Sequence, residues 1–202
     1  MKRAMLLLTV LAVVVVIVGT VLSLRSGPDA SQFADLKDPR LTRLPDEQML
    51  VVEVTGDPNV VGARAFKQLF STYYALDGVS RRQRAPAPRA RGPKPADTPR
   101  QQWVGYYALP VPAGAALPPS ATGGEPQTSI RTWTYGEVAE VLHVGPYSTE
   151  EPDINRLHAF VISKGYRVVG DHEEEYVRGP GMILAGDPNA YLTIIRLRTE
   201  KS

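Results

Sequence analysis

Three consecutive glutamates followed by a tyrosine are the side chains of this sequence best suited to ligand binding or acid–base chemistry. The stretch around them, 167–177, is predicted to be a strand, in which successive side chains point to opposite faces of a sheet. Glu174 and Tyr176 therefore share one face, and Glu173 and Glu175 share the other. Because glutamate is depleted in strands, at least one of these faces must hold its carboxylates in water or in a cleft.

In a cleft, the Glu174 carboxylate loses the water contacts that stabilise its charge. It then either pairs with a cationic, lipophilic ligand or changes its pKa and acts as an acid or a base. The alternative is an acidic strand end that faces solvent and pairs with the basic residues Arg167, Arg178 or Arg196. The spacing alone leaves both interpretations open.

Aromatic residues fall on most of the predicted elements, and aromatic faces attract organic cations. Beside Glu174 and Tyr176, we expect the rings of Tyr107, Trp133 and Tyr147 to line the cleft. Packing in the hydrophobic core is the alternative for each of these rings, because large aromatic side chains dominate cores as well as binding sites.

The three histidines, His143, His158 and His172, show no repeat of metal-ligand spacing, and the chain has no cysteine. We therefore expect no metal, no bound cofactor and no disulfide. His143 precedes a Gly-Pro turn and should bond to it, whereas His158 should lie on a helix surface. No phosphate-binding loop, dinucleotide fingerprint or nucleophile elbow is found, which favours a binding protein over an enzyme.

Periodicity predicts the order strand-helix-strand-strand twice, over residues 49–135 and 136–199. Helices on one side of an antiparallel sheet place the chain in the α+β class. The predicted elements in chain order are strand 49–55, helix 60–76, strands 103–109, 128–135 and 136–144, helix 149–164, and strands 167–177 and 191–198.

Two segments are predicted to lack regular structure. Residues 26–48 contain three prolines and read as a polar stalk, with a short helix near 32–37. Residues 79–101 are rich in proline, alanine and arginine and hold too few apolar side chains to bury, so we expect a flexible insertion. The alternative is a basic arm attracted to anionic lipid or another polyanion.

Residues 1–25 are predicted to be a membrane anchor. The uncharged stretch 4–24 has roughly the 20 residues that a helix needs to span a bilayer. A cleaved signal peptide is the alternative, although the apolar run is long and its end is a poor cleavage site. Lys2 and Arg3 precede the span, so the N-terminus should lie in the cytoplasm and the rest of the chain outside it.

The order of motifs in the last third carries a family resemblance. The segment 143–147 (His-Val-Gly-Pro-Tyr), a helix, the turn 164–166 (Lys-Gly-Tyr) and a strand with Glu174 and Tyr176 follow one another. This order resembles the second half of the gyrase-inhibitor-like (GyrI-like) small-molecule-binding domain, which also serves as the effector domain of some transcription regulators.

The resemblance implies that residues 49–200 form duplicated β-α-β-β halves, with two helices on one side of the sheet around a central cleft. It also implies that Glu174 projects into this cleft. We therefore expect a membrane-anchored module that binds an apolar, possibly cationic small molecule.

Two other functions are compatible with the same resemblance. Some relatives are hydrolases, in which case Glu174 would be a general base. A haem-binding family shares the duplicated fold, in which case His143 and His158 are the candidate axial ligands. The net charge of +2 gives no sign of a nucleic-acid partner. Anchor and stalk fill the residues before 49, so we expect no DNA-binding domain; protein partners stay unknown.

Overall fold

The computed structural model describes residues 27–92, 98–121, 126–180 and 186–202. The predicted anchor, residues 1–25, lies outside these ranges. Among the helices that they contain, none is long and apolar enough to cross a membrane.

Within the described residues, eight strands form one antiparallel sheet in the order β1-β6-β8-β7-β3-β4-β2-β5. Read from either end, this order places an edge strand first, then the strand that precedes a helix. The sheet therefore consists of two similar halves that meet where β3 lies beside β7. The strands are β1 (Arg40–Leu44), β2 (Glu47–Thr55), β3 (Arg89–Gly92), β4 (Val104–Pro110), β5 (Gln127–Trp133), β6 (Gly136–Val144), β7 (Tyr166–Arg178) and β8 (Leu192–Lys201).

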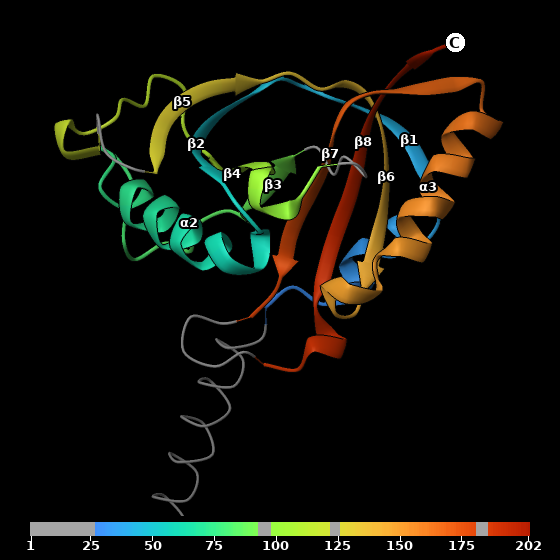
Figure 1. Ribbon diagram of the computed structural model, residues 1–202, viewed down its shortest axis with the longest axis horizontal. Helices are drawn as coiled ribbons and strands as arrows, with labels where there is room; N and C mark the ends of the chain where they lie inside the picture. Colours follow the sequence, from blue (N-terminus) through green and yellow to red (C-terminus); the bar gives the residue numbers. More distant parts are fainter. Residues whose placement is uncertain (1–26, 93–97, 122–125, 181–185) are drawn as a thin grey trace, which may run out of the picture.

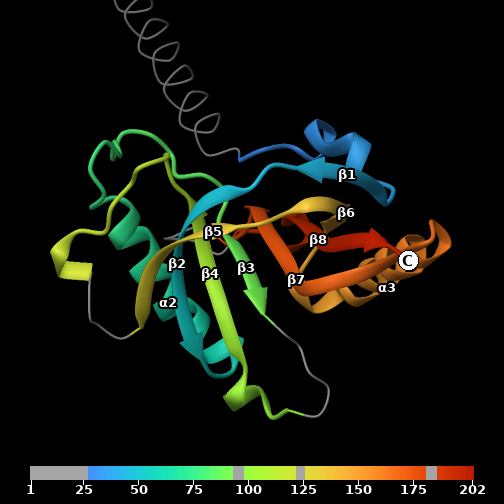
Figure 2. The same ribbon diagram turned by 90° about the horizontal axis from the view of Figure 1, so that it is seen from above.

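The two α-helices cover the same face of the sheet, one over each half (Figure 1). Seen from above, α2 lies beside β2 and β4, and α3 lies beside β7 and β8 (Figure 2). The α-helices are α2 (Pro58–Tyr73) and α3 (Glu151–Ser163), and short 3-10 helices are η1 (Ala30–Leu36), η2 (Arg100–Gln102), η3 (Pro119–Ala121), η4 (Tyr147–Thr149) and η5 (Pro188–Ala190). The expected α+β class is confirmed.

Helix α2 begins at Pro58, two residues before the predicted start at 60, and its N-cap is Asp57. The Asp57 carboxylate accepts a hydrogen bond from the Asn59 amide at 2.9 Å, and Pro58 occupies the first helical turn. Both features are favoured at helix N-termini. Ala65 and Leu69 then fall one helical turn apart and are fully buried against the sheet.

Each helix closes its own apolar core on this face. Leu157 and Val161 of α3 pack with Ala139, Val141 and Ile195 of β6 and β8. Burying a leucine side chain completely stabilises a fold by about 1.5–3 kcal/mol, so such contacts hold each helix on its half of the sheet.

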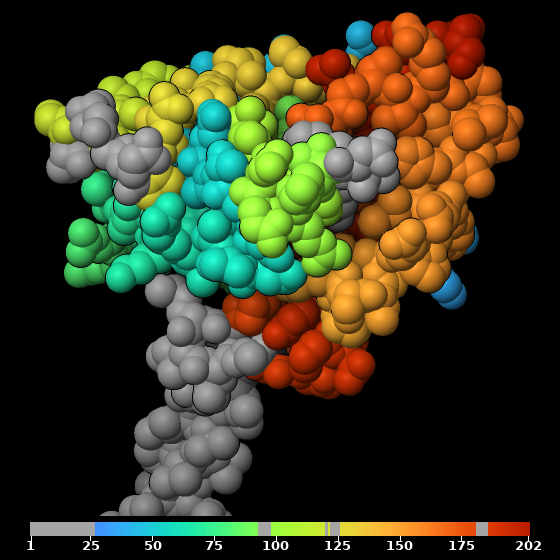
Figure 3. Space-filling view, viewed as in Figure 1, coloured from blue at the N-terminus to red at the C-terminus, as the bar shows by residue number. Residues whose placement is uncertain are grey.

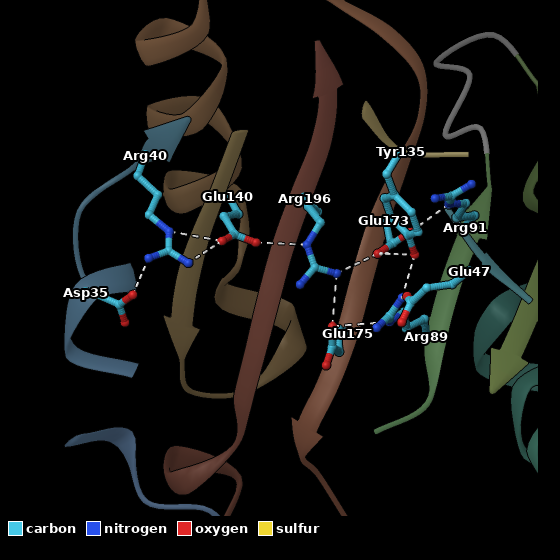
Figure 4. A network of polar contacts seen from close by, with 10 residues as sticks. All are labelled: Asp35, Arg40, Glu47, Arg89, Arg91, Tyr135, Glu140, Glu173, Glu175 and Arg196. Carbon is cyan, nitrogen blue, oxygen red and sulfur yellow. Dashed lines mark hydrogen bonds and ion pairs between the residues drawn. The ribbon is translucent and has the colours of Figure 1, made fainter. Parts of the chain in front are cut away.

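The opposite face carries a row of alternating charges that crosses five strands, as Figure 4 shows. The strand register places each member of the row directly beside a residue of opposite charge. Opposite charges paired in this way stabilise neighbouring strands. We call this row the charge ladder; its members are Arg40 on β1, Glu140 on β6, Arg196 on β8, Glu173 on β7 and Arg91 on β3.

The bonds of the charge ladder are short and largely buried. Arg196 donates to Glu140 at 3.0 Å and to Glu173 at 2.7 Å. Its Nη1 atom also lies 2.9 Å from Glu175. Burial alone would lower the pKa of Arg196, but attraction by Glu175, Glu173 and Glu140 raises that pKa overall. Arg196 is therefore charged at neutral pH.

The expected flexible insertion over 79–101 is wrong in its centre, because β3 lies there and joins the two halves. Arg91 bonds Glu173 at 2.7 Å, and Arg89 lies 3.2 Å from Glu175 and also bonds Glu47 and Tyr135. These partners compensate the charges that made the segment look solvated. The expectation of solvated arginines agrees with the structure before β3, where the arginines at 81, 82 and 84 are exposed.

The expected stalk over 26–48 is also corrected. The short helix predicted near 32–37 is η1, and its Leu36 packs with Leu142, Val177 and Ile194 under the sheet. After it, β1 pairs with β6 as an edge strand. The edge strand β5 holds the equivalent place beside β2, so the first β-α-β-β half is β2-α2-β3-β4 rather than the order predicted from sequence.

We predict that Arg196→Met strongly destabilises the protein, because it removes the cation shared by the buried Glu140 and Glu173 and the partly buried Glu175. Removing one partner of a buried ion pair costs about 3–5 kcal/mol. The free energy of unfolding is measured by urea titration. Arg167→Met, which removes the exposed pair with Glu200, is the matched control and should cost less than about 1 kcal/mol. Equal stability of the two variants would contradict a structural role for the charge ladder.

Candidate functional site

The Glu174 side chain lies on the helix-covered face of β7, whereas the side chains of Glu173 and Glu175 lie on the opposite face. Glu174 is 9% exposed. One carboxylate oxygen accepts a hydrogen bond from the Tyr176 hydroxyl at 2.7 Å, and the other lies 3.0 Å from His172 Nε2. These contacts confirm the predicted alternation along β7. The flanking glutamates do not form the solvent-facing strand end considered from sequence, because they pair with Arg196, Arg91 and Arg89 within the sheet. Glu174 contacts a hydroxyl and an imidazole.

A chain of aromatic rings surrounds Glu174 and runs from α2 toward α3. Phe66 and Tyr107 are 4.9 Å apart between ring centroids, Phe66 and Tyr176 5.8 Å, Tyr147 and Tyr176 5.3 Å, and Tyr147 and Tyr191 5.5 Å. Most of these pairs meet edge to face, a favoured arrangement of aromatic rings. We call these five residues the aromatic cluster.

The cluster is closed on most sides. Tyr107 and Tyr191 are 6% and 7% exposed, whereas Tyr147 is 40% exposed and is the most accessible ring of the three. Figure 3 shows this face of the molecule, with α2 and α3 on its two sides and the segment around η2, in green, between them. Of these three rings, Tyr147 is the one that solvent reaches.

The electrostatics of the cluster are set by burial and by carboxylates. Burial and the charges of Glu174 and Asp57 raise the pKa of the Tyr107 hydroxyl. Burial, followed by the charge of Glu174 and its hydrogen bond, raises the pKa of Tyr176 well above its ordinary value. Both phenols consequently stay protonated at neutral pH.

A second buried acid, Glu150, lies beside the cluster and was not found from sequence. The structure places it at the N-cap of α3, but its side chain makes no capping hydrogen bond and the residue is 4% exposed. The sequence signal that could have placed Glu150 near the cluster was its spacing, three residues after Tyr147 and within one turn.

Four of the five predicted ligand-binding residues come together, and Trp133 does not join them. Trp133 packs with Met49 and Val51 on the other face of the sheet, and the Arg91 guanidinium lies 4.0 Å from its ring centroid. Phe66 was not predicted as a site residue. It lies one helical turn after Gly62, a residue of the buried face of α2.

The histidines take separate places. His143 lies 2.9 Å from Asp153 through Nδ1 and 3.3 Å from the Pro146 carbonyl through Nε2, which confirms the predicted bond to the turn. Both ring nitrogens thus contact protein groups, which argues against axial haem ligation by His143. Burial and the nearby His172 lower the pKa of His158. In the described part of the chain, no group of three or more acidic or histidine side chains is arranged to hold a metal.

A shallow surface depression lies apart from the aromatic cluster. None of its lining residues belongs to the cluster; they come from the turns between β1 and β2 and between β5 and β6, from the start of β6, and from β7 and β8. Those residues are Asp46, Thr134, Tyr135, Gly136, Glu137, Val169, Arg198, Thr199 and Glu200. We therefore take Glu174 and the rings around it as the candidate site, since they combine a buried charge with apolar walls.

No known family model and no curated protein matches the sequence. Solved structures do share its fold. An uncharacterized conserved protein from Listeria innocua is 21% identical with a TM-score of 0.67, over 85% of this chain and 99% of that one. A hydrolase from Listeria innocua is 18% identical with a TM-score of 0.66, over 87% and 100%. The EcmrR C-terminal domain is 15% identical with a TM-score of 0.59, over 82% and 98%. At these identities the likeness shows the fold alone.

Proposed function

We propose that this chain binds a small, largely apolar cation between α2 and α3, with Glu174 as the counter-charge and the aromatic cluster as the walls. The observation that carries the proposal is the nearly buried Glu174 carboxylate set among the rings of Tyr107, Tyr147 and Tyr176. The GyrI-like resemblance of the last third of the sequence supports the same function.

Different kinds of ligand lose different amounts of hydration and gain different contacts when they enter this site. An organic cation gives up little hydration on entering an apolar site, and there it meets a carboxylate and aromatic faces. A small inorganic cation loses strong hydration and buries no apolar surface in return. A neutral apolar molecule gains burial but leaves the Glu174 charge without a ligand partner. The site therefore favours lipophilic cations.

Ligand entry requires the rings to part, because they contact one another. Tyr147 is the ring best placed to move, since it is the most exposed of the five rings and lies on a short 3-10 helix. Gly179 leaves room for its hydroxyl, because a Cβ at that position would lie 2.6 Å from it. Rigid strands hold Tyr107, Glu174 and Tyr176, so the fixed part of the site is the sheet and the moving part is η4.

We predict that Glu174→Gln weakens binding of a singly charged aromatic cation, N-methyl-tolylpyridinium, by about tenfold or more. Binding of the neutral tolylpyridine should change less than about threefold, because it has no charge to lose. Affinities are measured by calorimetry on the full chain in a non-ionic detergent at neutral pH. Glu151→Gln, which removes an exposed neighbouring charge, is the control. Equal losses for both compounds would refute the electrostatic role of Glu174.

Hydrolysis of a small electrophilic molecule is the second candidate function, favoured by the contact of Glu174 with His172 and Tyr176. In such a reaction Glu174 takes a proton from water as the water oxygen bonds to the electrophilic carbon, and Tyr176 protonates the leaving atom. Single-turnover consumption of an aryl epoxide should then be seen with the natural chain and lost in Glu174→Ala. Consumption that persists in the variant would exclude this role for Glu174.

We further propose that residues 1–25 hold the domain at a membrane, with the N-terminus in the cytoplasm. The support is the uncharged stretch 4–24 and the basic residues before it. The full chain should stay in the membrane fraction after an alkaline carbonate wash, and a chain without residues 1–25 should not. Release of the full chain by the wash would contradict the anchor.

A further inference from the structure

One end of the domain brings Gly27 together with the most exposed ring of the aromatic cluster. Figure 1 shows the end of β6, the start of α3, the end of β7 and η5 at its lower end, and the C-terminus at its upper end. A Cβ at Gly27 would lie 3.6 Å from Cγ of Arg178, the last residue of β7. A Cβ at the next residue, Gly179, would lie 2.6 Å from the Tyr147 hydroxyl. Gly27 and Tyr147 therefore lie at the same end.

The position of Gly27 in the sequence relates this end to the proposed anchor. Gly27 comes two residues after the stretch 1–25 that we propose to lie in a membrane. Two residues of chain span at most about 7 Å. An anchored chain therefore holds Gly27 close to the bilayer surface, and the end of the domain that carries Arg178 and Tyr147 faces the bilayer.

Arginine side chains gather at this end. The Cβ position of Gly27 is 3.7 Å from Nη2 of Arg84, and Arg84 is exposed, as are the arginines at 81 and 82. Arg178 is partly exposed on the other side of Gly27. Guanidinium groups suit phosphate oxygens, and basic residues beside a bilayer are attracted to anionic lipids.

The acids of the same end do not pair with these arginines in the printed hydrogen bonds of their turns. Asp29 accepts a hydrogen bond from the Ser31 amide at 2.9 Å, and Asp187 accepts one from the Asn189 amide at 3.0 Å. Both carboxylates thus cap short 3-10 helices, η1 and η5.

Apolar side chains are exposed beside the arginines. Val144, at the end of β6, is 52% exposed, and the partly exposed Tyr147 follows three residues later. Tyrosine rings are enriched at the interface between bilayer and water. Arginines next to exposed apolar side chains are typical of surfaces that lie in this interface, where charge attraction and apolar burial both contribute to binding.

We propose that this end of the domain, which we call the docking end, lies on the surface of a bilayer that contains anionic phospholipids. Its members are Arg84, Arg178, Val144 and Tyr147. The proposal rests on the proposed anchor and names the surface and the lipids that the anchored domain contacts. Docking places the most exposed ring of the candidate site at the membrane surface, where lipophilic cations collect under the negative surface potential. The rival explanation is that these arginines are solvated and the domain stands clear of the bilayer.

The test uses the full chain reconstituted into vesicles of phosphatidylcholine, with or without phosphatidylglycerol, that carry a nitroxide quencher on their headgroups. The chain has no cysteine, so a single introduced cysteine takes a fluorescent label at one place. Ser148→Cys places the label beside Tyr147, and Ser163→Cys places it at the far end of α3, about 20 Å away along the helix. Both serines are exposed. In anionic vesicles, the label at 148 should be quenched and the label at 163 should not.

Arg84→Gln combined with Arg178→Gln should undo docking. Each arginine near an anionic surface strengthens binding about fivefold, so the ratio of docked to undocked protein, read from the quenched fraction, should fall about twentyfold. Arg167→Gln combined with Lys201→Gln is the matched control, because it removes two cations from the opposite end of β7 and β8. This control should leave the ratio unchanged.

Equal quenching of the two labels would overturn the proposal. Quenching at 148 that depends neither on phosphatidylglycerol nor on the two arginines would overturn it as well. If the variant without Arg84 and Arg178 does not fold, the two labels on the otherwise natural chain still decide, through the comparison of neutral with anionic vesicles.

An alkaline carbonate wash separates this proposal from the anchor on which it rests. A chain that resists the wash but shows no quenching at 148 is anchored without docking, which overturns the docking end alone. A chain that the wash releases, but whose label at 148 is quenched in anionic vesicles, supports the docking end and contradicts the anchor. Release without quenching contradicts both.

Discussion

The pairing of Arg89 and Arg91 with Glu173 and Glu175 is the interaction on which the arrangement of this domain depends. Charges buried on a sheet face are tolerated only when each has a partner at bonding distance. Here the partners stand on β3 and β7, the two strands at which the halves meet. Gly92 fits the same place, since a Cβ there would lie 2.9 Å from the Val104 carbonyl oxygen of the neighbouring strand. Satisfying the charges therefore also joins the halves.

Strand β7 serves both faces of the sheet through alternation. Glu173 and Glu175 enter the charge ladder, while Glu174 and Tyr176 enter the aromatic cluster. A slip of one residue would exchange the two sets and leave both faces with the wrong chemistry. The ladder thus fixes the register that presents Glu174 to the helices, and it places the candidate ligand site on rigid backbone.

The two sets of carboxylates differ in what surrounds them, and this difference separates structure from function. The acids of the ladder lie against guanidinium groups, which stay charged at every pH of interest. Glu174 and Glu150 lie among phenols whose pKa values they raise, in a region lined by rings. This is the region in which we propose that a ligand binds.

Local pattern in the sequence determined the class of fold, both α-helices, the alternation along β7 and four of the five residues expected at the site. The fold class, the helices and the alternation follow from periods of two or near four residues, which hydrophobic patterning reveals. The place of Glu174 at the site was instead implied by the family resemblance. Tertiary structure alone decided that β3 forms within an arginine-rich segment, because the partner of Arg91 lies 82 residues away in Glu173. It likewise decided that Trp133 faces the ladder and that Glu150 is buried. Residues so distant in the chain leave no periodic signal of their pairing. Charged residues that were expected to be solvated therefore lie in the interior of the sheet.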